Sequence, residues 1–274
     1  MPTRSRPAAA PIALITDFGY RDHYVGVMHG VIASLAPAAK VIDITHGVPA
    51  QSIAAGALLL CESWRYFPKR TIFVAVVDPG VGTARRAIAI ETSSGTRFIG
   101  PDNGLLWPAV EQAGYRRAVE LRSKRYRLED VSSTFHGRDI FAPAAAHLWL
   151  GVSFKSLGPA LNPIARLQLG EVEESSDQLR GSIIYVDGFA NLVSNISREA
   201  FDRFQASFPR YTLFVTIDDG SPIDLYETYG DAPEGGLLAL FGSFRMLEIA
   251  VREGRAADRL AVGSGATVTV HVKR

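Results

Sequence analysis

The stretch from Thr71 to Arg86 reads TIFVAVVDPGVGTARR. Its apolar, β-branched beginning predicts a buried strand. The strand delivers Asp78 into a loop whose glycines let the backbone approach a ligand closely. Ligands of open α/β sheets gather where strands end, so this stretch predicts an α/β domain with a site at that end. A tight turn capped by Asp78 is the competing interpretation.

Short apolar runs alternate with helical patterns on both sides of this stretch, from residue 12 to about residue 165. Strands are expected over Ile12 to Thr16, Val41 to Ile44, Thr71 to Val77, Ala87 to Glu91 and Arg97 to Ile99. Helices are expected over Tyr24 to Leu35, Ile53 to Trp64 and Ile140 to Leu150. Residues 12–165 are therefore predicted to form an α/β domain with a central mixed sheet.

The pattern changes after residue 165. Strand-like runs cover Ser182 to Val186, Leu192 to Ile196, Tyr211 to Ile217, Leu237 to Phe241 and Ala266 to Val272. Turn signals such as Asp187-Gly188 and Asp219-Gly220 separate them. We expect residues 166–274 to form a smaller, all-β, barrel-like domain. The polar stretch from Glu171 to Asp177 is the linker candidate between the two domains.

The charge balance argues against polyanionic partners. The 29 Lys and Arg residues nearly cancel the 28 Asp and Glu residues, and 47% of side chains are hydrophobic. A chain without strong positive charge gains little from nucleic-acid backbones or anionic membranes. We expect a small-molecule substrate, with no nucleic-acid partner and no membrane association.

The N-terminus and the single cysteine indicate the compartment. Residues 1–11 have no apolar stretch of signal-peptide length behind them, and we expect them to form a disordered tail. No run approaches the roughly 18 apolar residues that a membrane span needs. Cys61 is the only cysteine and lies in an apolar run, which favours a packing role in a reducing compartment. A cytoplasmic location is therefore predicted.

Common cofactor and catalytic motifs are missing from the sequence. The 6 histidines show neither an HExxH pattern nor a close His/Cys set, so no metal is predicted. The sequence has no G-x-S-x-G elbow, no Walker loop and no G-x-G-x-x-G spacing. Serine hydrolase, ATPase and NAD chemistry are disfavoured, and no cofactor is expected.

Two further loops of the first domain carry polar side chains. His136 precedes Gly137 at the predicted start of a helix, where the helix dipole favours the neutral imidazole. The alternative is that Asp139 caps this helix and His136 only packs. Asp17 and Asp22 follow the first strand, where a carboxylate can accept both hydroxyls of a ribose. Helix capping explains Asp17 about as well.

The second domain offers two candidate binding turns. Asp187, Phe189 and Asn191 combine a carboxylate, an aromatic ring and an amide, which suit an amine, a purine face and a purine edge. Ser243, after Gly242, can offer a hydroxyl to a carboxylate. A hairpin turn and a plain turn are the respective alternatives.

A series of segments occurs in one order along the chain. It reads ITDFGYRDHYVGVMHGVI, VIDITHGVP, VDPGVGTARR, IGPDNGLL, TFHGRDIFAPAAAHL, VDGFANLVSNI and GSFRMLEIAVREGRAADRL. Together these segments resemble the S-adenosylmethionine hydroxide adenosyltransferase family, from about residue 12 to the C-terminus. That family is related to the bacterial fluorinase and chlorinase.

The resemblance implies an N-terminal α/β domain, a C-terminal β-barrel and a homotrimer. Active sites are then expected at subunit interfaces, between the N-terminal domain of one subunit and the C-terminal domain of its neighbour. The matching positions imply three catalytic residues around the attacking water, Asp78, Arg85 and His136. They imply a ribose contact at Asp17, methionine contacts at Asp22, Asp187 and Ser243, and adenine contacts at Phe189 and Asn191.

The implied activity is hydrolysis of S-adenosylmethionine at the ribose C5′ atom, giving adenosine and L-methionine. The leaving group is a neutral thioether and needs no general acid, so the chemistry depends on aligning water. The alternatives are a halide-dependent 5′-halo-5′-deoxyadenosine synthase and a non-catalytic protein that binds S-adenosylmethionine or adenosine. The Asp78, Arg85 and His136 set favours water as the nucleophile.

Overall fold

The computed structural model describes residues 10–167 and 169–273. The chain divides into two compact units, and the boundary lies between residues 167 and 168. The sequence predicted the boundary between residues 165 and 166. Residues 1–9 of the expected tail lie outside the described residues. The carbonyl of Pro11 accepts a hydrogen bond from the N–H of Ile72, 3.1 Å away. Within the described residues, no helix has the length and apolar character to cross a bilayer.

The first unit is built on one mixed sheet. Its strands are β1 (Ile12–Thr16), β2 (Val41–Thr45), β3 (Ile72–Val76), β4 (Ala87–Thr92), β5 (Arg97–Pro101) and β6 (Tyr115–Glu120). They lie in the order β2-β1-β3-β5-β4-β6. The first four positions pair in parallel, whereas β4 is antiparallel to both β5 and β6. The predicted α/β domain with a mixed sheet is confirmed.

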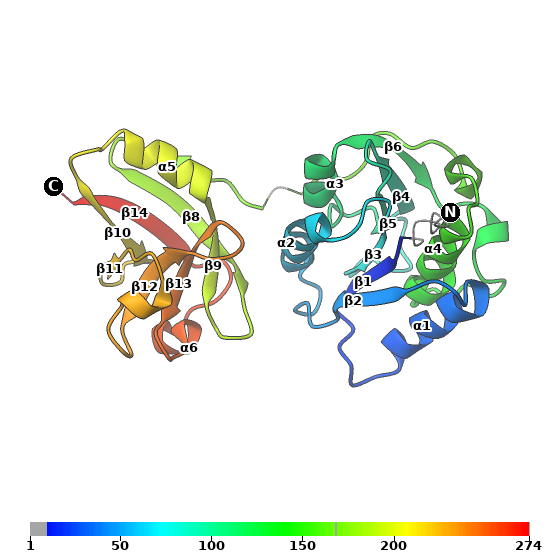
Figure 1. Ribbon diagram of the computed structural model, residues 1–274, viewed down its shortest axis with the longest axis horizontal. Coiled ribbons are helices and arrows are strands. Elements are labelled where there is room, and N and C mark those ends of the chain that lie inside the picture. The colour runs from blue at the N-terminus through cyan, green and yellow to red at the C-terminus, as the bar shows by residue number, and fades with distance from the viewer. Residues whose placement is uncertain (1–9, 168, 274) are drawn as a thin grey trace, which may run out of the picture. The chain divides into compact units, whose positions relative to one another are not determined.

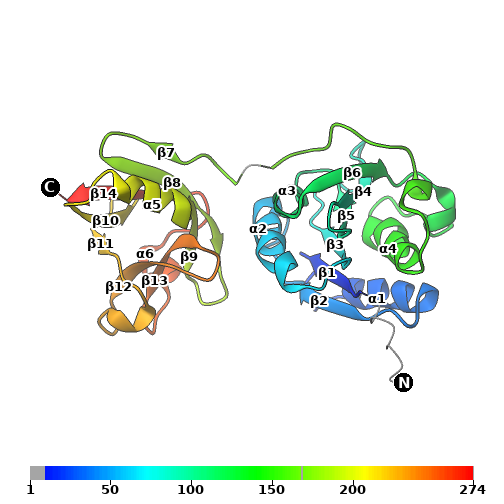
Figure 2. The same ribbon diagram turned by 45° about the horizontal axis from the view of Figure 1, so that its top comes forward.

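Helices cover both faces of this sheet. They are α1 (Tyr24–Leu35), α2 (Ile53–Ser63), α3 (Trp107–Ala113) and α4 (Ala142–Trp149), with single turns at Trp64–Tyr66, Lys124–Tyr126, Gly137–Phe141 and Phe154–Leu157. Figures 1 and 2 show α1 and α4 on one face and α2 and α3 on the other. Because helices cover both faces, every residue of β1 and β3 is buried. All of them are apolar except Thr16, which is polar and also buried. The carboxyl ends of these strands carry the loops of the candidate site.

Gly100 of β5 allows its strand to approach β3 closely. A Cβ atom at this position would lie 2.3 Å from the carbonyl oxygen of Ala75. Gly100→Ala is therefore expected to lower the free energy of unfolding by about 3 kcal/mol, because the backbone must shift in a packed core. Urea titration of the first unit's unfolding measures this loss.

The matched control is Gly26→Ala in α1, where an added Cβ meets no described atom within 4 Å. Alanine favours helix over glycine by about 0.5–1 kcal/mol, so this variant is expected to be at least as stable as the wild type. Equal stability of the two variants would contradict the close approach at Gly100.

The second unit is a barrel-like antiparallel sheet. Its strands are β7 (Glu173–Glu174), β8 (Gln178–Val186), β9 (Leu192–Ser197), β10 (Thr212–Ile217), β11 (Ile223–Asp224), β12 (Leu237–Phe241), β13 (Met246–Val251) and β14 (Thr267–Lys273). The order is β11-β10-β14-β8-β9-β13-β12, with β7 paired to β8. A parallel bridge between Leu225 and Ala239 links the two ends of this order. The predicted barrel-like domain is confirmed.

Two helices and a 3₁₀ turn accompany this sheet: α5 (Arg198–Ala206), α6 (Ala256–Leu260) and Tyr229–Asp231. The Ser197 hydroxyl caps α5 by accepting a hydrogen bond from the Ala200 N–H, and Phe201 and Phe204 bury its apolar face in the core. The predicted linker is wrong for Glu171 to Asp177, because Glu173 and Glu174 pair with β8. Two exposed carboxylates on a short edge strand resemble a linker in sequence.

Candidate active site

Asp78 and Arg85 form a forked ion pair at the end of β3. The Arg85 Nε donates to Asp78 Oδ1 at 2.9 Å, and Nη2 donates to Oδ2. The loop folds back on itself because the Val81 N–H donates to the Asp78 carbonyl and the Thr83 N–H donates to the Gly80 carbonyl. The Asp78 and Arg85 side chains are only 6% and 10% exposed. Two parallel bonds in a shielded setting fix the carboxylate strongly.

His136 joins this pair through the same guanidinium. The Arg85 Nη2 lies 2.8 Å from the His136 Nδ1. A guanidinium can only donate, so Nδ1 accepts this bond and a neutral ring carries its proton on Nε2. The guanidinium also lies over the Phe141 ring, 5.4 Å from its centroid. Arg85 therefore bridges Asp78 and His136.

Burial lowers the pKa of His136 below its usual 6.5, and the positive charge of Arg85 lowers it further. The imidazole is thus neutral at pH 7. Because the folded-state pKa lies below the unfolded one, the unfolded chain takes up this proton first on acidification. The contribution of neutral His136 to stability is complete above pH 6.5 and is lost as the pH falls through the folded pKa.

The pH dependence can be measured by urea unfolding between pH 5 and pH 8, with wild type and His136→Gln compared. We expect the stability difference between them to shrink on acidification below pH 6.5, because only the wild type carries this group. His147 and His271, whose pKa values are also lowered by burial, are common to both proteins and cancel. A difference that stays constant over this range would contradict the neutral assignment.

The loops that carry Asp78 and His136 touch through their backbones. Gly82 has a φ of +78°, and a Cβ there would lie 2.4 Å from the Ser133 carbonyl oxygen. The buried Asp139 carboxylate accepts the Ser132 N–H at 2.8 Å and pairs with Arg138. Asp139 lies inside the π-helical turn Gly137–Phe141, whose N-cap is His136, so it fixes the preceding loop rather than capping the helix.

Asp17 faces the same pocket as Asp78 and His136. This pocket encloses about 390 Å³, and its walls include Phe18, Tyr24 and Phe135. One Asp17 oxygen accepts the Gln51 N–H at 2.8 Å. Asp17 does not cap α1, whose N-cap is His23. Asp22 is exposed before α1 and lies outside the described lining of the pocket.

Arg86 makes a separate ion pair. Its Nε donates to Asp102 Oδ2 at 2.7 Å, and Asp102 Oδ1 accepts the Ala165 N–H at 2.8 Å. This second pair ties the loop to the segment before the domain boundary. Of the two adjacent arginines, it is therefore Arg85 that contacts Asp78 and His136.

In the second unit, Asp187 organises the turn after β8. Its Oδ1 accepts the N–H groups of Phe189 and Asn191 at 2.9 and 2.8 Å, and its Oδ2 accepts the Asn191 side-chain amide at 3.2 Å. The turn leaves the Phe189 ring 77% exposed, whereas Asn191 is buried. An exposed ring held by a rigid turn is suited to stacking on a flat ligand.

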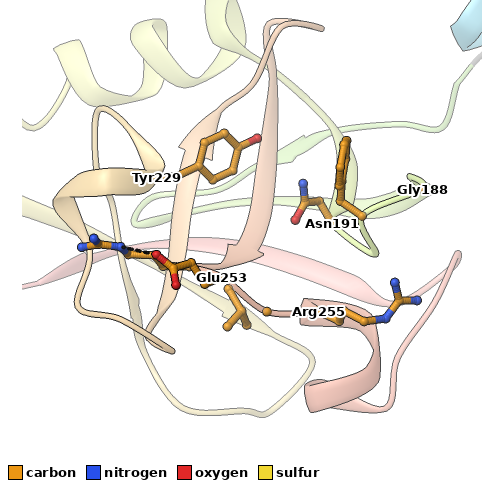
Figure 3. Close-up of a pocket in the computed structure, with 9 residues that line it drawn as sticks. Gly188, Asn191, Tyr229, Glu253 and Arg255 are labelled. Carbon is orange, nitrogen blue, oxygen red and sulfur yellow. Dashed lines mark ion pairs between the residues drawn. The ribbon is translucent and has the colours of Figure 1, made fainter.

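Phe189 and Asn191 line a pocket of about 540 Å³. Figure 3 shows Tyr229 and Asn191 above Glu253 and Arg255 in this view of the pocket. None of Tyr229, Glu253 and Arg255 was named as a site residue from the sequence, although Glu253 and Arg255 lie within the last of the segments that carry the family resemblance. Ser243 is exposed on the turn between β12 and β13, outside the described lining of this pocket.

The buried carboxyl group of Glu248 holds one residue of the pocket wall, Tyr229. The Tyr229 hydroxyl donates to the Glu248 Oε1 at 2.6 Å. Burial raises the pKa of Glu248, and burial together with this hydrogen bond raises the pKa of Tyr229. Tyr229 therefore stays a neutral phenol at any physiological pH.

Comparisons with known proteins bear on both units. Residues 12–158 match the family model of the SAM hydroxide adenosyltransferase N-terminal domain, and residues 181–269 match that of the C-terminal domain. The chain is 43% identical over 257 residues to a protein from Salinispora arenicola (strain CNS-205) named (R)-S-adenosyl-L-methionine hydrolase, covering 93% of this chain and 95% of that one.

The chain is also similar, at lower identity, to a protein with another name. The chain is 27% identical to a protein from Nocardia brasiliensis (strain ATCC 700358 / HUJEG-1) named fluorinase, with 95% of this chain and 96% of that one covered. A crystal structure of an uncharacterized conserved protein from Thermotoga maritima superposes with a TM-score of 0.87 at 34% identity, covering 95% of this chain and 99% of that chain.

Proposed function

This chain belongs to the S-adenosylmethionine hydroxide adenosyltransferase family, and we infer that it hydrolyses S-adenosylmethionine to adenosine and L-methionine. The observation that carries this function is the shielded arrangement in which Arg85 bridges Asp78 and His136. It borders the pocket that holds Asp17. The hydrolase from Salinispora arenicola is much closer in sequence than the fluorinase, which favours water over halide.

In the proposed mechanism, water attacks the ribose C5′ atom from the side opposite sulfur. The C5′–O bond forms while the C5′–S bond breaks, and its electron pair leaves with the neutral thioether of methionine. Asp78 orients the water and accepts its proton, which passes on to solvent. The Arg85 charge stabilises the developing hydroxide, and His136 fixes the guanidinium through Nδ1.

The remaining candidate residues bind the substrate in this proposal. Asp17 accepts the ribose hydroxyls, the exposed Phe189 ring stacks on adenine and Asn191 reads its edge. Asp22, Asp187 and Ser243 surround the methionine portion. No cofactor takes part in the reaction, and the compartment proposed is the cytoplasm, where the single buried Cys61 stays reduced.

The deciding experiment supplies S-adenosylmethionine in halide-free buffer made with ¹⁸O water, with products followed by mass spectrometry. Labelled adenosine and methionine are expected. Turnover that appears only with chloride or fluoride would indicate the halogenase reaction instead, and tight binding without turnover would indicate a sensor. Each sulfonium epimer is supplied separately, because we propose that the chain shares the (R) preference in its relative's name.

We also propose that the enzyme is a homotrimer whose sites combine the first unit of one subunit with the second unit of its neighbour. Co-expression of Asp78→Ala chains with Phe189→Ala chains tests this assembly. Sites shared between subunits regain activity, because some receive an intact Asp78 from one chain and an intact Phe189 from another. Sites contained within single chains would stay inactive in the mixture.

A further inference from the structure

Two histidines and an aspartate converge beside the loop that carries Asp17. His29 belongs to α1, Asp43 to β2, and His46 follows β2 directly. The Nε2 atoms of His29 and His46 lie 2.8 and 3.1 Å from the same Asp43 oxygen, Oδ1. All three ligand atoms lie within 4.8 Å of one another. We propose that this cluster binds a divalent first-row transition ion of the Zn²⁺ class.

The spacing of the donor atoms fits such an ion. Zn²⁺ binds imidazole nitrogen and carboxylate oxygen at about 2.0–2.2 Å, so tetrahedral ligand atoms lie roughly 3.3 Å apart. The two separations at Asp43 are 2.8 and 3.1 Å, and the two imidazole nitrogens lie within 4.8 Å of each other, so small side-chain shifts bring all three atoms to this spacing. Three protein ligands leave a fourth position for water.

His46 provides the independent observation. Its side chain is completely buried, and among residues 10–167 and 169–273 no group forms a hydrogen bond with its Nε2. The Asp43 Oδ1 atom lies 3.1 Å from it, as an ion-pair contact. The other ring nitrogen, Nδ1, is held by the Thr16 hydroxyl at 2.7 Å. Metal-binding histidines commonly have one ring nitrogen fixed by such a partner while the other faces the ion.

An ion can reach the cluster from solvent. The His29 and Asp43 side chains are 36% and 27% exposed. The Tyr20 hydroxyl, 3.5 Å from the second Asp43 oxygen, closes the outer side only partly. The Gly19 N–H donates to the His46 carbonyl at 2.7 Å, so a bound ion would tie α1 and β2 to the loop after β1. Binding to the folded state would raise the melting temperature.

The test uses full-length protein without a histidine tag, treated with a chelator and then titrated with Zn²⁺ by calorimetry. Co²⁺ is added separately, and its visible absorption reports the ligand geometry. We expect one ion per chain, a raised Tm, and affinity at least about 100-fold weaker in His29→Ala and in Asp43→Asn, since loss of even an outer partner costs 10–100-fold. Both substitutions are at partly exposed positions, whereas His46→Ala would disturb the core.

His23→Ala is the matched control, because His23 is an exposed histidine at the start of the same helix. It should bind Zn²⁺ as the wild type does. Absence of saturable binding of either ion would overturn the proposal. So would equal affinity of wild type and His29→Ala, or loss of binding in His23→Ala, because either result places the ion elsewhere.

Discussion

Asp78→Asn is expected to lower kcat for hydrolysis by about 10²–10⁴-fold, the range that a positioned proton acceptor contributes. Asparagine keeps the shape of the side chain but cannot take a proton from water. It also leaves the Arg85 charge without its anionic partner. The Kd of S-adenosylmethionine, measured by calorimetry, should stay within a few-fold, because the substrate is held by other groups.

Asp102→Asn provides the matched control for this loss. Asp102 is a similarly buried carboxylate, 2% exposed, that pairs with Arg86, the residue next to Arg85, outside the described lining of the pocket. This variant should lower stability and keep kcat within a few-fold of wild type. Comparable loss of kcat in both variants would mean that Asp78 acts only through folding.

Asp17→Asn is expected to raise the Kd of S-adenosylmethionine by about 10–100-fold, since hydrogen bonds to a charged group contribute about 1.5–3 kcal/mol. The asparagine oxygen can still accept the Gln51 N–H, so the loop keeps its shape. Single-turnover rates at saturating substrate should change little, because the proposed contact of Asp17 is with ribose and not with the attacking water.

A ligand without ribose hydroxyls isolates this contact. The affinity for adenosine should fall in Asp17→Asn, whereas that for 2′,3′-dideoxyadenosine should be the same in wild type and variant. A penalty of equal size for both ligands would show that Asp17 acts on the shape of the loop and not on ribose.

The fold could be predicted largely from local patterns. The predicted strand Ile12 to Thr16 and helix Tyr24 to Leu35 match the observed bounds, because buried apolar runs and helical spacing are strong signals. The helix α5 was not predicted, since it is short and mostly polar. Its N-cap Ser197 and its two buried phenylalanines, Phe201 and Phe204, indicate a helix only once the core that the phenylalanines contact is known.

The site was predictable where its residues lie in ordered motifs. Asp78, Arg85 and His136 were named from such motifs, and the structure connects them by hydrogen bonds. Their catalytic roles stay predictions. Asp22 and Ser243 were named in the same way, yet both are exposed and outside the pockets of their own units.

Other groupings exist only in three dimensions. His29 and Asp43 lie 14 positions apart on different elements, and the packing of α1 near the edge strand β2 brings their side chains together. Metal motifs depend on regular spacing within one element, so this cluster gave no signal. Tyr229 and Phe189 are likewise distant in sequence and line the same pocket only in the folded protein.

The close approach of Gly82 to Ser133 also limits which residue can occupy position 82. Any side chain at position 82 would meet the Ser133 carbonyl oxygen, because even its Cβ would lie 2.4 Å from that atom. The two loops would have to move apart, and Asp78 would be drawn away from His136. A residue without a side chain, outside the described lining of the pocket, therefore sets the distance between the two halves of the catalytic arrangement.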